Sequence, residues 1–244
     1  MRILPIASTS VMVAAVLSIS PADAQRASGA EGVNISGVWW ASSYSPKVQP
    51  VGGGGLPFTA EGKAAYEKNM AGVKNGSIVD KARTLCVLDG IPRILETPYP
   101  FDIVQTPGQV SFIFEQNRDV RIVDFTQPLP DAETLADNPR YHGYNTAHWE
   151  GDTLVIQSVG FTDKTFIDAF GAPHTDEMHV TERIRTINGD KQLEDVVTVE
   201  DPKYYTKPWN ARFVYDSHPE VNLETYVCGE KHRDLSTVKG VKGF

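Results

Sequence analysis

From residue 101 onward, apolar and polar positions alternate with a period of two, which is typical of strands with one buried face. This alternation predicts strands over residues 101–106, 110–115, 120–124, 144–149, 153–160, 179–187, 192–200, 211–215 and 223–228. Glycine-containing turns separate several neighbouring runs, as at Pro107-Gly108 and Glu150-Gly151-Asp152. Such short turns predict hairpins and therefore antiparallel pairing.

The chain before residue 101 is less regular. Residues 35–40 predict a first strand, and residues 59–70 combine a threonine N-cap with good helix formers, which predicts the one helix. Residues 75–100, with scattered glycine and proline, indicate a long ordered loop, and a second, proline-rich loop follows over residues 127–140.

About nine or ten strands joined mostly by short turns predict an all-β fold with one short N-terminal helix. We expect an antiparallel β-barrel, lipocalin-like, or a curled sandwich. Residues 25–244 are long enough for one such domain. Because a barrel gathers its loops at its mouth, we expect the loop over residues 161–178 to lie at a functional end.

The first 24 residues have the features of a secretory signal peptide. Arg2 precedes an apolar run over residues 11–19, and Ala22-Asp23-Ala24 fits a cleavage site before Gln25. We therefore expect an exported, periplasmic protein without an integral membrane segment, since no later run is apolar for long enough. Association with the outer membrane and the oligomeric state stay open.

Charge and cysteine content narrow the partners and the compartment. The net charge of -8 argues against a nucleic-acid partner, because phosphates need a basic surface. The two cysteines, Cys86 and Cys228, predict a disulfide in an oxidising compartment, and two buried thiols are the alternative.

Ionisable side chains crowd into residues 163–183, which suggests acid–base chemistry. Asp163 and Lys164 open this segment, and His174 and His179 bracket an acidic turn within it. Histidine titrates near neutral pH, so neighbouring charges can tune it. The bland alternative is a salt-bridged turn with ordinary surface histidines.

In the predicted strand from His179, alternation puts His179 and Glu182 on opposite faces. If Val180 and Ile184 face the interior, Glu182 lies inside with them, needs a partner and becomes the candidate general base. If the other face is inward, His179 takes that role. The apolar neighbours favour Glu182.

Two aromatic groups are candidate ligand walls. Residues 201–209 carry Tyr204, Tyr205, Lys207 and Trp209 on a proline-stiffened loop, and the strand over residues 144–149 carries Tyr144, His148 and Trp149. Tyr204 is also a candidate proton donor. The same rings would serve equally well to cover the end of a barrel core.

The histidines do not follow a metal-binding pattern. His142, His148, His174 and His179 lie near carboxylates, but the chain has no His-Glu-x-x-His and no Cys-x-x-Cys. No Gly-x-Ser-x-Gly elbow of a serine hydrolase occurs either. We therefore predict no metal site and no cofactor.

Several longer motifs carry a resemblance. They are Ile35-Ser-Gly-Val-Trp39, Leu56-Pro-Phe-Thr-Ala-Glu-Gly62, Pro98-Tyr-Pro-Phe101, Ile103-Val-Gln-Thr-Pro-Gly108, Trp149-Glu-Gly-Asp-Thr-Leu154, Gly160-Phe-Thr-Asp-Lys-Thr165, Pro173-His-Thr-Asp176 and Glu200-Asp-Pro-Lys-Tyr-Tyr-Thr-Lys-Pro-Trp209. With them the chain resembles a large family of exported bacterial proteins, mostly of unassigned function, over nearly its whole mature length. It also resembles exported lyases that act on lignin-derived aromatic dimers and release formaldehyde from a phenylcoumaran-like side chain.

The resemblance implies a cofactor-independent lyase that acts by acid–base chemistry on a small aromatic substrate. In that case Glu182 or His179 would be the base, Lys164 or Tyr204 would stabilise a phenolate, and Trp149 or Trp209 would stack on a ring. Two other classes stay open from the sequence: a periplasmic carrier of a small apolar ligand, and a metal-dependent hydrolase.

Overall fold

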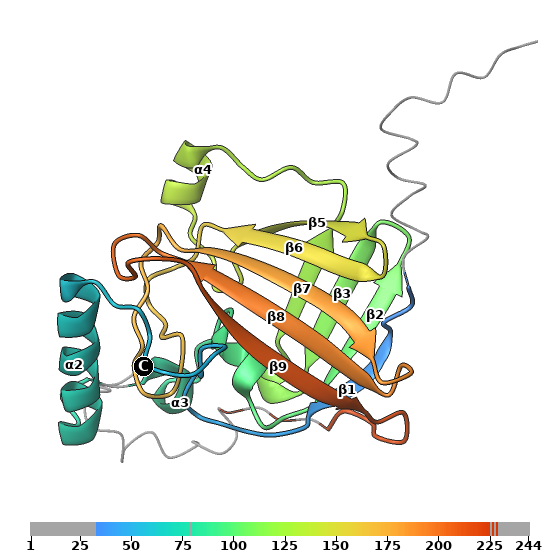
Figure 1. Cartoon of the computed structure of the whole chain (residues 1–244), viewed down its shortest axis with the longest axis horizontal. Coiled ribbons are helices and arrows are strands. Elements are labelled where there is room, and N and C mark those ends of the chain that lie inside the picture. Colours follow the sequence, from blue (N-terminus) through green and yellow to red (C-terminus); the bar gives the residue numbers. More distant parts are fainter. Residues whose placement is uncertain (1–32, 79, 225, 227, 229–244) are drawn as a thin grey trace, which may run out of the picture.

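The computed structural model describes residues 33–78, 80–224, 226 and 228. Nine strands form one antiparallel sheet that curls into a nearly closed barrel (Figure 1). The strand order is β4-β3-β2-β1-β9-β8-β7-β6-β5. The predicted all-β barrel with an early helix is confirmed, whereas the predicted signal peptide over residues 1–24 lies outside the described residues.

The strands are β1 (Gly37–Ala41), β2 (Phe101–Thr106), β3 (Gln109–Phe114), β4 (Val120–Asp124), β5 (Tyr144–Glu150), β6 (Thr153–Val159), β7 (His179–Ile187), β8 (Gln192–Glu200) and β9 (Trp209–Ser217). The helices are α2 (Ala60–Asn75), α3 (Lys81–Thr84) and α4 (Ala132–Asp137), and the 3-10 turns are η1 (Arg93–Glu96) and η2 (Gln116–Arg118). In the described part of the chain, no helix is long and apolar enough to cross a membrane.

Three sequence expectations differ from the structure. The strand predicted over residues 223–228 is wrong at Leu223 and Glu224, which are irregular, because β9 already pairs with β1 on one side and with β8 on the other. The loop predicted over residues 75–100 contains α3 and η1. The proline-rich loop contains α4, whose N-cap Asp131 accepts a hydrogen bond from the Thr134 amide at 2.9 Å.

Helix α2 begins after the predicted N-cap, Thr59, and continues past the predicted end at residue 70 to Asn75. The Thr59 hydroxyl accepts a hydrogen bond from the Gly62 amide at 3.0 Å, and the helix ends at Gly76 in the left-handed conformation. A Cβ at Gly62 would lie 2.1 Å from the Tyr204 carbonyl oxygen, so only glycine allows this close approach. The helix is thereby fixed against the loop that follows β8.

The two ends of the barrel differ because the number of strands is odd. Each neighbouring pair is antiparallel, so the two edge strands, β4 and β5, run in the same direction. A parallel neighbour cannot be reached by a tight turn, and the chain returns from β4 to β5 through residues 125–143. One end therefore carries tight turns such as Asn188-Gly189-Asp190, all with positive φ, and the other carries the long loops with α2 and α3 (Figure 1).

Side chains, rather than a backbone ladder, connect the two edge strands. Arg121 on β4 donates to both carboxylate oxygens of Glu182 on β7, at 2.8 and 2.5 Å. It also donates to Asn145 Oδ1 on β5 at 2.8 Å and to Ser158 Oγ on β6 at 3.0 Å. Arg121 thus links β4 to the three strands across the gap, inside the barrel.

Alternation along β7 is resolved in favour of the interior position of Glu182. Val180, Glu182 and Ile184 are buried, and His179 is exposed. The side chains of Arg121 and Glu182 are both fully buried. The expectation that Glu182 lies inside and has a partner is therefore met by Arg121.

Replacement of Arg121 should show how much the stability of the barrel depends on the Arg121–Glu182 pair. We expect Arg121→Leu to lower the free energy of unfolding by about 3 to 5 kcal/mol, because it leaves Glu182 buried without its counter-charge. The double variant Arg121→Leu/Glu182→Leu should recover a large share of that loss, since no charge is then buried. Urea unfolding of the three proteins measures both effects, and a single variant as stable as the wild type would contradict this role.

Candidate functional site

A cavity of about 400 Å³ opens at the end of the barrel that carries the long loops. Its volume lies in the usual range for small-molecule sites. The charged residues in its wall are Asp89, Arg93 and Glu96, the aromatic ones are Tyr44, Tyr99 and Tyr226, and Gln116, Asn117 and Cys228 are among the others. We call this cavity the Glu96 pocket.

The charged residues reach the pocket because the segment that carries them is anchored in the core. Ile91, Ile94 and Leu95 are buried in the main hydrophobic cluster. Arg93 and Glu96 alternate with these anchors on the same short turn, η1, so the folding of η1 buries them as well. Burial of a charge is costly unless it finds a partner.

Arg93 is the one cation that this segment brings into the pocket. Its two terminal nitrogens donate to the two carboxylate oxygens of Asp80 at 2.9 and 2.7 Å. Its Nε atom lies 3.0 Å from Asp89 Oδ1. All of the directed contacts of the guanidinium described here go to these two carboxylates, so Glu96 receives only its long-range charge.

The pKa of Asp89 is raised but stays below 7, so this carboxyl is ionised at pH 7. The pKa of Asp89 is raised to about 6, first by burial and then by the charges of Asp80 and Asp119, against the lowering effect of Arg93. Gln116 Nε2 donates a hydrogen bond to Asp89 Oδ2, which fixes the orientation of the carboxylate. A carboxylate with this pKa is a competent general base.

Glu96 has the opposite protonation state at the same pH. The pKa of Glu96 is raised to about 9, first by burial and then by the charge of Asp168, against the lowering effect of Arg93. Its Oε1 atom is buried without a hydrogen-bond partner among the described residues. Glu96 is therefore a neutral carboxylic acid at pH 7 in the wall of the pocket.

The neighbouring acids are satisfied within the protein. Asp168 accepts hydrogen bonds from the backbone amides of Val48, Phe170 and Ala172 at 3.3, 2.9 and 3.0 Å. Asp119 lies 2.8 Å from His142 Nε2. Glu96 differs from these neighbours, because its Oε1 atom has no hydrogen-bond partner among the described residues.

The pocket thus contains two carboxyl groups whose environments push their pKa values apart. One group is ionised and one is protonated over the same pH range, an arrangement that identifies a base and an acid. A small molecule with aromatic rings and a hydroxyl group could contact the tyrosine walls and both carboxyls. The arrangement supports proton transfer without a further reagent.

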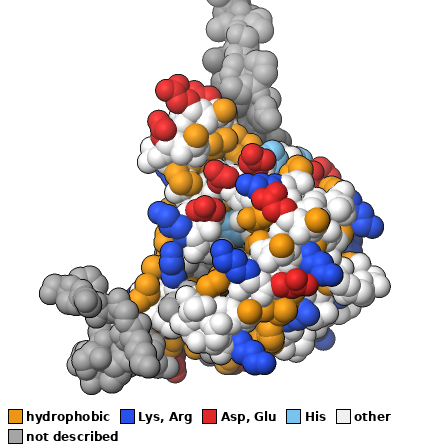
Figure 2. Space-filling view, turned by 90° about the vertical axis from the view of Figure 1, so that its left-hand side faces the viewer, with side chains coloured by type: hydrophobic (Ala, Val, Ile, Leu, Met, Phe, Trp, Pro, Cys, Tyr) orange, Lys and Arg blue, Asp and Glu red, His pale blue; other side chains and the backbone are white. Residues whose placement is uncertain are grey.

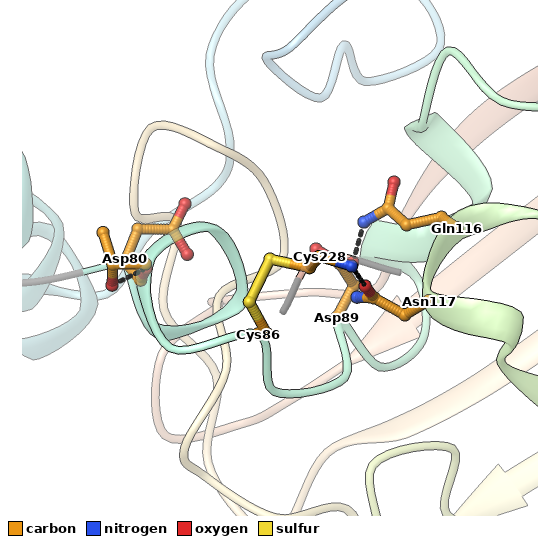
Figure 3. Close-up of a disulfide and its surroundings, with 7 residues drawn as sticks. Asp80, Cys86, Asp89, Gln116, Asn117 and Cys228 are labelled. Carbon is orange, nitrogen blue, oxygen red and sulfur yellow. Dashed lines mark hydrogen bonds between the residues drawn. A yellow bond between two sulfur atoms is a disulfide. The ribbon is translucent and has the colours of Figure 1, made fainter. Parts of the chain in front are cut away.

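The predicted disulfide is confirmed and borders this pocket. Cys86 and Cys228 are bonded across a sequence separation of 142 residues. Figure 3 shows the bond lying between the loop after α3 and the η2 turn, with Gln116 and Asn117 on the η2 side and Asp89 beside it. A disulfide is compatible with an oxidising compartment.

The outer surface at this end has no single dominant charge. Figure 2 shows acidic and basic side chains interspersed over the face on the α2 side of the barrel. Exposed pairs such as Arg183 with Glu150 and Lys63 with Glu67 mix the two signs elsewhere on the surface. Discrimination between ligands therefore depends on the pocket interior more than on a long-range field.

The structure does not bring the predicted acid–base residues together. His174 is buried, with Nε2 2.8 Å from the Thr165 hydroxyl, and burial lowers its pKa. His179, Asp163 and Lys164 are exposed. Glu182 is inside the barrel, bonded to Arg121, and its role as a base stays a prediction.

The predicted aromatic and basic wall residues fall into two separate groups. Tyr205 is buried and donates to the Pro173 carbonyl at 2.7 Å, and Trp209 packs against it at 5.5 Å, so these rings cover the barrel end. Tyr204 is half-buried beside them and Lys207 is exposed. On β5, Tyr144 lies under Arg140, His148 pairs with Glu150 and Trp149 is half-buried. His148 and Trp149 adjoin the tight turn at Gly151, at the other end of the barrel.

Sequence reasoning missed Asp89, Arg93 and Glu96. The sequence predicts a loop over residues 75–100, and loop charges are normally solvated. A signal was present: three isoleucine or leucine residues alternate with charged ones close to Cys86, which predicts that the segment is pulled into the core.

Among the described residues, no group of three or more His, Cys, Asp or Glu side chains is placed to hold a metal ion.

Comparisons with known proteins add no constraint, since neither a family model nor a curated protein matches the chain. The interpretation of the pocket therefore depends on its geometry and electrostatics.

The proton on Glu96 should appear in the pH dependence of stability. Folded protein keeps this proton up to about pH 9, whereas an unfolded chain loses it near 4.5. Its stabilising contribution is thus complete below 4.5 and is lost as the pH rises to 9, with a slope of up to about 1.4 kcal/mol per pH unit. We expect Glu96→Gln to flatten the slope of unfolding free energy measured in urea between about pH 5 and 8.5. An unchanged slope in this variant would contradict the protonated state.

Proposed function

We propose that this protein is a cofactor-independent lyase that acts on a small aromatic substrate in the Glu96 pocket. The observation that carries the proposal is the pairing of a protonated Glu96 with an ionised Asp89 in one cavity of about 400 Å³. The resemblance to exported lyases of lignin-derived dimers supplies the substrate class and the periplasmic location. The proposal assigns the role of general base to Asp89, in place of Glu182 or His179, which the sequence suggested.

The proposed reaction needs one base and one acid. Asp89 takes the hydroxyl proton from the hydroxymethyl group of a phenylcoumaran-like dimer, and the carbon–carbon bond to that group breaks as formaldehyde leaves. The released electron pair forms a carbon–carbon double bond and expels the aryl ether oxygen, which Glu96 protonates to a phenol. The products are a stilbene and formaldehyde, so the step balances without an oxidant, a reductant or water.

The pKa values suit these roles. A phenol has a pKa near 10, so an acid with a pKa of about 9 donates to a departing phenolate without a large mismatch. A base with a pKa of about 6 is ionised at neutral pH. The rings of Tyr44 and Tyr99 in the pocket wall offer stacking surface for an aromatic substrate.

The packing of the barrel interior argues against the alternative function, a carrier of a small apolar ligand. Ring contacts join Phe101, Phe112 and Phe114, and the Arg121–Glu182 pair lies in the same barrel interior. Side chains fill the space in which a lipocalin-like carrier would hold an apolar ligand. The Glu96 pocket is instead lined by carboxyl groups, which favours an enzyme.

Turnover and its pH profile test the proposal. We expect phenylcoumaran-type dimers to give formaldehyde, detected with a trapping reagent and mass spectrometry, and the product to form equally with a chelator present. The rate should rise through about pH 6 as Asp89 ionises and fall through about pH 9 as Glu96 ionises.

Variants assign the two roles. Asp89→Asn and Glu96→Gln should each lower the rate by about 100-fold or more, the size typical of a lost acid or base. Glu133→Gln, a carboxyl exposed on α4, is the matched control and should keep the wild-type rate. If both pocket variants stay active while His179→Ala or Glu182→Gln abolishes turnover, the base is not in the Glu96 pocket.

A further inference from the structure

One wall of the Glu96 pocket comes from beyond the last strand of the barrel. Tyr226 and Cys228 line the cavity, although β9 ends at Ser217. The Tyr226 ring centroid lies 4.8 Å from that of Tyr99, at a tilt of 33°. This aromatic pair connects the loop before β2, which carries Tyr99, to the segment after β9, which carries Tyr226.

Two backbone hydrogen bonds and one covalent bond are among the contacts that hold this wall. The Cys228 amide donates to Asn117 Oδ1 at 3.2 Å, and the Glu224 amide donates to Glu115 Oε2 at 2.8 Å. The covalent contact is the disulfide from Cys228 to Cys86 (Figure 3). Each hydrogen bond is weak in net terms, whereas the disulfide ties the segment that carries Tyr226 covalently to Cys86.

The disulfide is not needed to close the barrel itself. β9 pairs with β1 and β8 before the chain reaches Tyr226, and the Arg121 contacts lie wholly within the strands. The disulfide lies outside the sheet and beside the pocket, so we expect it to affect the geometry of the ligand site more than that of the sheet.

We propose that the Cys86–Cys228 disulfide is a working part of the ligand site: it positions Tyr226 against Tyr99, and its reduction removes this wall while the barrel stays folded. The inference depends on the pocket named in the proposed function but not on the lyase reaction. A dithiol reductant would convert the disulfide to two thiols and would itself become a disulfide. Ligand binding is thereby coupled to an oxidising compartment.

A chemical probe tests the position of Tyr226 without any ligand. Tetranitromethane nitrates accessible tyrosines, and mass spectrometry measures the extent at each residue. We expect Tyr99 to react faster in the reduced protein and in Cys86→Ser/Cys228→Ser than in the oxidised protein. Tyr144, which is half-buried and does not line the Glu96 pocket, serves as the internal reference and should react equally in all three.

Circular dichroism on the same samples should show unchanged strand content. Equal Tyr99 nitration in the oxidised and reduced proteins would overturn the proposal, as would loss of strand signal on reduction.

A second measurement connects the wall to binding. Titration with 2-naphthol, a fluorescent phenol, should give an affinity about tenfold weaker for the reduced protein, the size of one lost aromatic contact. Tyr226→Ala should bind as weakly in its oxidised form, and its reduction should weaken binding no further. A further loss on reduction of this variant would contradict positioning through Tyr226. If 2-naphthol binds no form while Tyr99 nitration still responds to reduction, the disulfide's positioning role stands and the ligand class of the proposed function is wrong.

Discussion

The guanidinium of Arg121 is the contact on which closure of the barrel depends. An odd number of antiparallel strands leaves β4 and β5 parallel at the gap, and Arg121 reaches from β4 to Asn145, Ser158 and Glu182 on the far side. One cation cannot neutralise two carboxylates in the same interior. Burial and the nearby charge of Glu182 accordingly raise the pKa of Asp195 well above its ordinary value. The interior therefore contains one ion pair and a second carboxyl whose surroundings favour its protonated form.

The same principle recurs at the end of the barrel with a different outcome. Arg93 pairs with Asp80 and Asp89, and Glu96 is left to keep its proton. Asp195 is buried inside the barrel, whereas Glu96 borders a cavity of about 400 Å³. In both places one cation cannot pair with every nearby carboxyl group, and the pKa of the carboxyl left over is raised.

The sheet could be predicted from the sequence because its signals are local. Alternation fixed strands such as β7 and β8 to the residue, and Thr59 marked the start of α2. The alternation at Val180 and Ile184 also put Glu182 inside the barrel. What alternation cannot supply is the partner of Glu182, because Arg121 lies 61 residues away.

The pocket could not be predicted for a related reason. Asp89, Arg93 and Glu96 are buried by tertiary contacts of Ile91, Ile94 and Leu95. The loop around His174 has denser ionisable residues, but His174 itself is held by Thr165 and Thr175. The density of ionisable residues along the sequence therefore favours the loop around His174, and not the segment that forms the pocket, as the functional site. Only the three-dimensional packing separates Glu96, whose Oε1 has no hydrogen-bond partner among the described residues, from acids that the backbone satisfies, such as Asp168.

The most direct test of this account is the titration of Glu96 itself. Protein labelled with ¹³C at the glutamate carboxyls can be followed by NMR across the pH range, with Glu96→Gln used to assign the signal. The account predicts a midpoint near 9, with the signal of the protonated acid at neutral pH. A midpoint near the ordinary value of 4.5 would show that Glu96 is ionised in the folded protein, and the acid–base pair in the pocket would not exist.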